Sequence, residues 1–174
     1  MEKITKQELD KLMIAVQKGA KALGLFKDAQ TARMKYPQYN YILACMYDEI
    51  YTSTIDTVLS QLSKLYKRSE TETTLFTIAS KFNNSELKKE FYQTKDSCYE
   101  SQDFVKYTQG WEMYNNNLMM TEPDYFLPVG NVKKLLDFAE KYIREAGKDV
   151  GIKYGEMFIS INSLTGLMDF VEKN

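Results

Sequence analysis

The sequence predicts an all-α fold, an antiparallel helical bundle built around one long central helix. Apolar residues recur at spacings of three and four over long stretches, which is the period of an amphipathic helix. The 174 residues include only three prolines and eight glycines, so few positions interrupt a helix. Length and composition fit a single domain over residues 1–174, without an internal repeat or a linker.

The long helices are expected first along the chain. Thr5 and Glu8 form a capping-box pattern, so a helix should begin near residue 6 and run to the mid-thirties, with Gly24 as a point where it can break. Pro37 suits the first turn of the next helix. That helix carries apolar residues on two adjoining faces, which predicts the longest and most central helix, packed by several others.

Shorter helices are expected in the middle of the chain. Ser69 and Glu72 repeat the capping-box pattern ahead of an apolar run, which predicts a short third helix. Asn84 or Ser85 can cap a fourth, because these side chains accept hydrogen bonds from first-turn amides. Helical character continues beyond the fourth helix, with an interruption near Gly110.

Two further helices are expected after a loop that is bracketed by prolines. Asn131 opens the first of them, which has a well-marked apolar side. Gly147 and Gly151 mark its end, since glycine commonly terminates helices. Residues 163–173 are expected to form a closing helix.

The chain contains no histidine, and this excludes several kinds of chemistry. Without an imidazole there is no Ser-His-Asp or Cys-His relay and no histidine general base near neutral pH. Cys45 and Cys98 are the only cysteines and cannot complete a four-thiolate zinc site. The sequence therefore assigns no catalytic residue, no metal site and no cofactor.

The sequence indicates a cytoplasmic protein that does not span a membrane. The N-terminus is too charged for a secretory signal, and the longest apolar run, residues 41–47, stops at Asp48. Net charge is −1 but uneven, with an excess of four positive charges in residues 1–40 and of four negative charges in residues 85–125. Either these charges lie on solvated helix faces, or they create opposite electrostatic fields that orient docking within a monomer or between two copies.

Carboxylates of the long helix and the segment around Trp111 are the most informative polar groups. The long helix contains Asp48, Glu49 and Asp56, and Asp48 shares a face with Cys45 and Ile55, so we expect it to be partly buried. We expect such an aspartate to be hydrogen bonded to an adjoining helix rather than to hold a metal. The second group combines aromatic and amide side chains: Trp111, Tyr114, Asn115, Asn116 and Asn117. Such a group suits binding to a single-stranded nucleic acid, and it equally suits an ordinary helix end, where Asn is favoured.

Tyrosine is in excess, with 13 residues, and several tyrosines crowd the start of the long helix. Tyrosine provides apolar contact area with a polar tip, which fits both the edge of a core and a protein interface. We expect a homodimer whose interface includes part of this stretch, with four candidate tyrosines: Tyr36, Tyr39, Tyr47 and Tyr51.

Three segments together resemble a known family. Residues 39–66, then the short run Thr-Thr-Leu-Phe-Thr-Ile at 73–78, and later Val-Lys-Lys-Leu-Leu-Asp-Phe-Ala-Glu-Lys-Tyr-Ile-Arg-Glu-Ala at 132–146 are similar to helices of HEPN-type proteins of the AbiU-like abortive-infection branch. The resemblance lies in helix order and spacing over roughly residues 35–173. It implies an HEPN-like helical bundle that pairs with a second copy.

Many HEPN proteins are metal-independent ribonucleases that use an arginine and a histidine a few residues apart. In this chain the corresponding place is residues 111–120, which contain neither residue. The resemblance therefore implies a non-catalytic protein that acts by protein binding, in phage defence or toxin-antitoxin type regulation. The alternatives are a divergent ribonuclease that uses Tyr, Lys or carboxylates, and an RNA-binding module.

Overall fold

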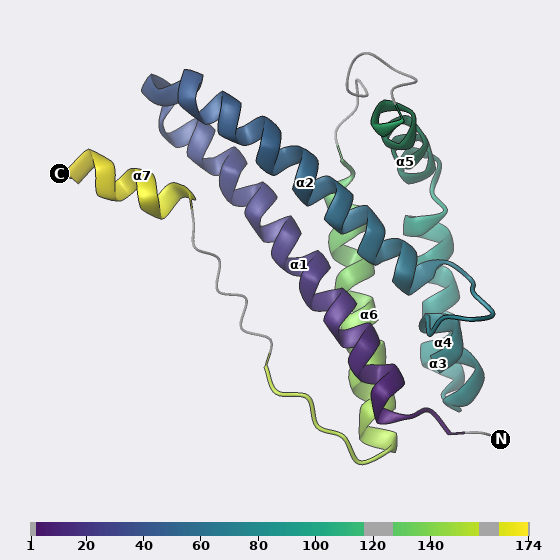
Figure 1. Ribbon diagram of the computed structural model, residues 1–174. Helices are drawn as coiled ribbons and strands as arrows, with labels where there is room; N and C mark the ends of the chain where they lie inside the picture. The colour runs from purple at the N-terminus through teal and green to yellow at the C-terminus, as the bar shows by residue number, and fades with distance from the viewer. Residues whose placement is uncertain (1–2, 117–126, 157–163, 174) are drawn as a thin grey trace.

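The computed structural model describes residues 3–116, 127–156 and 164–173, apart from the side chains of residues 40, 42–44, 47 and 48. The described residues form seven α-helices, one 3-10 turn and one π-helical turn, and they contain no strand (Figure 1). The predicted all-α class is confirmed. No helix in these described segments is long and apolar enough to cross a bilayer.

Two long helices run along most of the length of the molecule. Helix α1, Lys6–Lys35, and helix α2, Asn40–Tyr66, run antiparallel side by side and are joined by the 3-10 turn η1, Pro37–Tyr39 (Figure 1). The prediction that the helix after Pro37 is the longest is wrong, because α1 has 30 residues and α2 has 27. Helix α1 continues through Gly24, whose helix penalty of about 1 kcal/mol is offset by burial of Leu23 and Phe26 around it.

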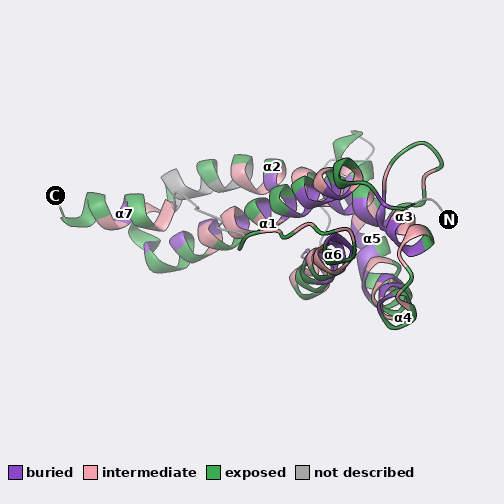
Figure 2. Cartoon of the chain, turned by 90° about the horizontal axis from the view of Figure 1, so that it is seen from below, coloured by how far each residue is buried: buried purple, intermediate pink, exposed green. Residues whose placement is uncertain are grey.

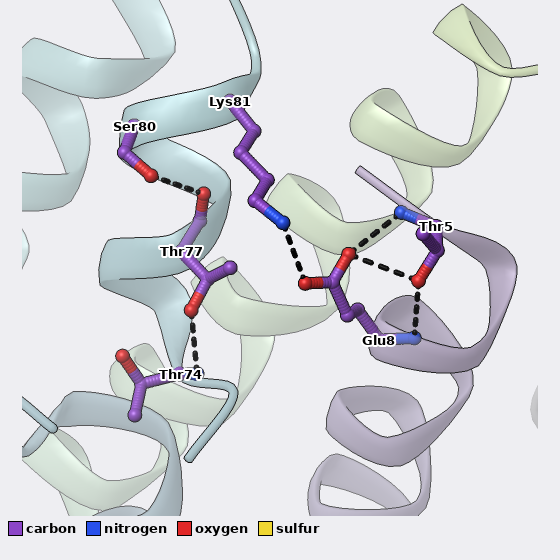
Figure 3. Close-up of polar contacts among 6 residues, drawn as sticks. All are labelled: Thr5, Glu8, Thr74, Thr77, Ser80 and Lys81. Atoms are coloured by element: carbon purple, nitrogen blue, oxygen red, sulfur yellow. Dashed lines mark hydrogen bonds and ion pairs between the residues drawn. The ribbon is translucent and has the colours of Figure 1, made fainter. Parts of the chain in front are cut away.

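The start of α1 is fixed by the predicted capping box. The Glu8 amide donates to Thr5 Oγ1 at 3.2 Å, and the Thr5 amide donates to Glu8 Oε2 at 2.7 Å (Figure 3). Lys81 Nζ reaches the other carboxylate oxygen of Glu8 at 2.8 Å. Burial works to raise the pKa of Glu8, but the hydrogen bonds from Lys81 and Thr5 outweigh it and lower the pKa. Glu8 thus also ties α1 to the third helix.

Helix α3, Leu75–Lys81, begins later than the Ser69 pattern predicts. Ser69 Oγ accepts from the Thr71 and Glu72 amides within a turn that lies ahead of the helix. The capping box is formed by Thr74 and Thr77, shown in Figure 3, because Thr74 directly adjoins the apolar run that packs into the core. The assignment of Ser69 as the cap of this helix is therefore wrong.

Helix α4, Ser85–Thr94, is capped by Asn84 as predicted and is followed by the π-helical turn η2, Lys95–Tyr99, and by helix α5, Gln102–Asn115. The interruption lies at η2 and not at Gly110, which is buried inside α5. Lys95 stabilises this break, because its buried ammonium pairs with Asp96 at 2.8 Å and with Glu100 at 2.6 Å.

Helix α6, Val129–Asp149, crosses the pair formed by α1 and α2 (Figures 1 and 2). Helix α7, Leu164–Lys173, lies apart from α6, at the far end of that pair. Helix α6 begins two residues before the predicted Asn131. The side chain of Asn131 does not start the helix, and its Nδ2 donates to Ser101 Oγ at 3.0 Å. Gly19 on α1 permits the close crossing, since a Cβ there would meet Leu136 at 2.9 Å. Gly151, with a φ of 78°, follows the end of α6.

An aromatic cluster occupies the core between α2, α4 and α6. Phe91 is its centre, with Tyr66 stacked at 6.1 Å between ring centroids and Phe76 edge-on at 5.0 Å. Phe138 and Tyr142 complete the cluster from α6. Helices α1 and α2 extend well beyond this core (Figures 1 and 2). We call the packed helices around the core the body. The arm is the part of α1 and α2 that projects from the body and is joined by η1.

Two buried tyrosines of this cluster should respond differently to removal of their hydroxyl groups. Tyr66 donates to the carbonyl oxygen of Leu135 at 2.6 Å, whereas the Tyr142 hydroxyl is buried without a hydrogen-bond partner among the described residues. Tyr66→Phe should lower the free energy of unfolding by about 1 kcal/mol, and Tyr142→Phe should leave it unchanged or raise it. Urea denaturation measures both values, and equal losses in the two variants would contradict this arrangement.

Candidate functional site

The first candidate is the segment around Trp111, in the last turns of α5. The Trp111 side chain is only 2% exposed, and its indole N–H donates to Asp56 Oδ1 on α2 at 2.5 Å. Asn115 Nδ2 donates to the same oxygen at 2.7 Å. The expectation that a carboxylate of the long helix is hydrogen bonded to an adjoining helix is confirmed at Asp56. Asp48 lies outside the described side chains.

The faces of the Trp111 ring are occupied by the protein itself. Tyr107 is stacked at 6.3 Å between centroids, Tyr114 is tilted at 5.6 Å, and Tyr51 of α2 is edge-on at 6.0 Å. A nucleic-acid base would reach the indole only if α5 moved away from α2. The Asn116 amide donates to its own helix at the Glu112 carbonyl oxygen, and Asn117 lies outside the described residues.

A groove of about 520 Å³ runs beside this contact, between α2 and the η2–α5 segment. Its acidic groups are Asp56, Glu100 and Glu112, and Lys67 lies at its rim. The phenol of Tyr99 also lines it, and burial raises the pKa of that group. The described residues bring together no group of three metal-ligating side chains, here or elsewhere. Asp56, the acidic group of the groove nearest to Trp111, already accepts two hydrogen bonds.

Three of the predicted interface tyrosines make contacts within the chain, Tyr36 and Tyr39 at the arm end and Tyr51 against the main core. Tyr36 is buried against Met168 of α7, and Tyr39 is partly buried in the same small cluster. Tyr51 is half-buried, with its ring 5.3 Å from that of Phe26. The side chain of Tyr47 lies outside the description. Tyr36, Tyr39 and Tyr51 thus hold helices of one chain together.

The second candidate is α7, which polar contacts hold on the arm. The Leu164 amide donates to Asp28 Oδ2 at 2.6 Å, so a side chain of α1 accepts a hydrogen bond from the first turn of α7. Lys35 Nζ pairs with Asp169 at 2.6 Å. Glu172 accepts from Gln38 Nε2 at 3.1 Å, and its hydrogen bond with Tyr39 raises the pKa of that phenol.

This docking covers only half of the apolar arc of α7. Met168 is buried and Leu164 half-buried against the arm. Three apolar side chains on the adjoining part of the arc remain largely exposed: Leu167 at 55%, Phe170 at 65% and Val171 at 48%. A helix that turns half of its apolar side to solvent presents a surface that suits contact with another molecule.

The arm end as a whole is rich in exposed apolar groups. Ten large apolar side chains of the described residues are exposed, and six of them belong to α7 or to the adjoining ends of α1 and α2: Met34, Tyr41, Met46, Leu167, Phe170 and Val171. We call this region the distal surface. Sequence reasoning missed it, although apolar residues at 164, 167, 168, 170 and 171 make a wider arc than one neighbouring helix can cover.

No known protein family, characterised protein or solved structure matches this chain. We therefore infer function from the side chains and their arrangement. Of the two candidates, the Trp111 contact is enclosed and satisfied within the protein, whereas the distal surface presents apolar area to solvent.

Proposed function

We propose that this protein acts by binding another protein chain and that the distal surface is the docking site. The observation that carries the proposal is the half-covered apolar arc of α7, with Leu167, Phe170 and Val171 exposed. Burial of apolar area drives most protein association, at roughly 25 cal/mol per Å². Tyr41 and Met34 add exposed amphipathic and flexible side chains, types that are enriched at protein interfaces.

Protein binding at the distal surface is consistent with a non-catalytic, HEPN-like role. Support for the family comes from the order of elements, since the resembling segments 39–66 and 132–146 fall on α2 and α6, with α3 following α2. The absence of histidine from the whole sequence supports a binding role over acid–base catalysis near neutral pH. A setting in phage defence or toxin-antitoxin type regulation follows from the resemblance.

The proposal predicts that charges on α7 release the protein from its assembly. The double change Leu167→Glu and Val171→Glu places carboxylates on side chains that are already exposed, so the fold should persist. Fluorescence-detected sedimentation in extract of the native cells should show the wild-type chain in a species larger than its own 20.3 kDa. The double variant should sediment as the free chain.

Ile14→Glu is the matched control, because Ile14 is exposed at 49% but lies in the body half of α1. That variant should sediment like the wild type. A wild-type chain that sediments alone, or an assembly unaffected by the α7 charges, would contradict the proposal.

A further inference from the structure

We propose that α7 has two states, a helix docked on the arm and a released, unfolded segment, and that only the docked state completes the distal surface. This inference rests on the proposed function, because it concerns the regulation of the same docking site. Helix α7 provides three of the six apolar residues of that surface, Leu167, Phe170 and Val171. Release of α7 removes them from the arm and thereby divides the docking site.

Helix α7 is too short to be a stable helix by itself. It has 10 residues, whereas isolated helices of fewer than about 12–15 residues are marginal in water. Thr165 and Gly166 in its first turn have low helix propensities and weaken it further. Folding of α7 therefore depends on its contact with the arm, and a released α7 is also an unfolded one.

The apolar contact between α7 and the arm is small. Helices α1 to α6 all contribute buried residues to the main core, whereas α7, over its described residues 164–173, contributes none. Instead Met168 is buried against Tyr36, with Leu164 and Tyr39 partly buried around them. Hydrophobic stabilisation is roughly proportional to the apolar area that is buried. Docking of α7 is therefore weaker than the packing of the other helices.

The remaining contacts are polar, and water reaches most of them. Lys35 Nζ pairs with Asp169 at 2.6 Å, although these side chains are 49% and 39% exposed. Gln38 donates to Glu172 at 3.1 Å on the surface, and Asp28 accepts from the first turn of α7. Ion pairs between exposed side chains add little stability and are screened by salt. Weak contacts of this kind keep the docked and released states close in free energy.

Two states of similar free energy make binding at the distal surface adjustable. A partner that recognises only the docked state binds with an affinity that is reduced in proportion to the docked fraction. The Lys35–Asp169 pair contributes to that fraction, although neither residue is among the exposed apolar groups of the surface. Ionic strength, or a change of charge at either residue, then regulates partner binding while the apolar docking residues stay the same.

Hydrogen exchange of the purified full-length chain, measured by mass spectrometry, tests for the two states. Amides of residues 168–173, which an α-helix pairs with carbonyl groups four residues earlier, are protected only in the docked state. They should exchange at least about 100-fold faster than amides of α6, because α7 can open while the main core stays closed. A shorter Debye length, about 3 Å in 1 M salt against about 30 Å in 0.01 M salt, should speed their exchange several-fold and leave α6 unchanged. Equal protection of α7 and α6, or exchange of α7 that salt does not alter, would overturn the inference.

Lys35→Glu tests the ion pair with Asp169. The change places two carboxylates together, so exchange of residues 168–173 should rise towards the rate of an unfolded chain. A chain with both Lys35→Glu and Asp169→Lys restores opposite charges and should regain protection. Lys18→Glu is the matched control, because Lys18 is an exposed lysine of the same helix, next to Gly19 where α6 crosses. Exchange in Lys35→Glu that equals the wild type, or that the reversed pair does not slow, would contradict the role of this pair.

Sedimentation in extract of the native cells tests the consequence for binding. Lys35→Glu should lose the larger species, while the reversed pair and Lys18→Glu should retain it. A Lys35→Glu chain that exchanges fast at residues 168–173 but stays in the larger species overturns the inference and leaves the proposed function standing. A wild-type chain without a larger species contradicts the proposed function, and the exchange measurements decide the two states of α7 independently.

Discussion

Replacement of Phe91 by alanine should lower the free energy of unfolding by about 3–5 kcal/mol, the largest effect we expect from one side chain. Phe91 is fully buried at the centre of the aromatic cluster and contacts rings from α2, α3 and α6. Its removal leaves a cavity that the surrounding rings cannot fill, because they are fixed on three separate helices. Urea denaturation followed by circular dichroism measures the change.

Tyr92→Ala is the control for Phe91→Ala. Tyr92 is the next residue on α4, and its side chain is exposed. Its loss should cost about 1 kcal/mol or less, as is usual for a surface position. Equal costs for the two variants would show that the cluster around Phe91 is not the centre of the core.

Asp56→Ala should cost about 1–3 kcal/mol, because it leaves the buried indole N–H of Trp111 without an acceptor. The same change removes the acceptor of Asn115, so the end of α5 should loosen from α2. Trp111 is the only tryptophan, and its fluorescence therefore reports on this contact directly. We expect a red-shifted emission as water reaches the ring.

Two further variants separate the contributions to this contact. Asp56→Asn retains one carbonyl oxygen as an acceptor and should recover much of the lost stability. Asn115→Ala removes only the more exposed hydrogen bond and should cost less than Asp56→Ala. An Asp56→Ala protein with unchanged stability and unchanged emission would contradict the buried hydrogen bond.

A helix cap can be predicted from the sequence when the residues that form it lie close together in the chain. Thr5 and Glu8 are three residues apart, and the capping box that they form depends on little else. Ser69 and Glu72 have the same spacing, yet the helix begins after Thr74, where apolar side chains first reach the core. The break at η2 likewise depends on ion pairs of a buried lysine, Lys95, which a helical pattern does not reveal.

The candidate sites depend on contacts between distant parts of the chain. Tyr36 is buried by Met168, and Asp28 receives the first turn of α7, so residues more than 100 positions apart decide what the arm exposes. The sequence indicated tyrosine-rich contacts near residues 36–51 but could not show that α7 covers Tyr36. The wide apolar arc of α7 itself was visible in the sequence as a signal.

Photo-crosslinking from residue 167 in living cells tests the central claim, protein binding at the distal surface, most directly. A benzophenone amino acid replaces Leu167 in one strain and Ile14 in another, both exposed positions. We expect irradiation-dependent adducts from position 167 that a protease removes and a ribonuclease does not, with few adducts from position 14. Adducts from position 167 that are sensitive to ribonuclease, or no adducts above those of position 14, would contradict it.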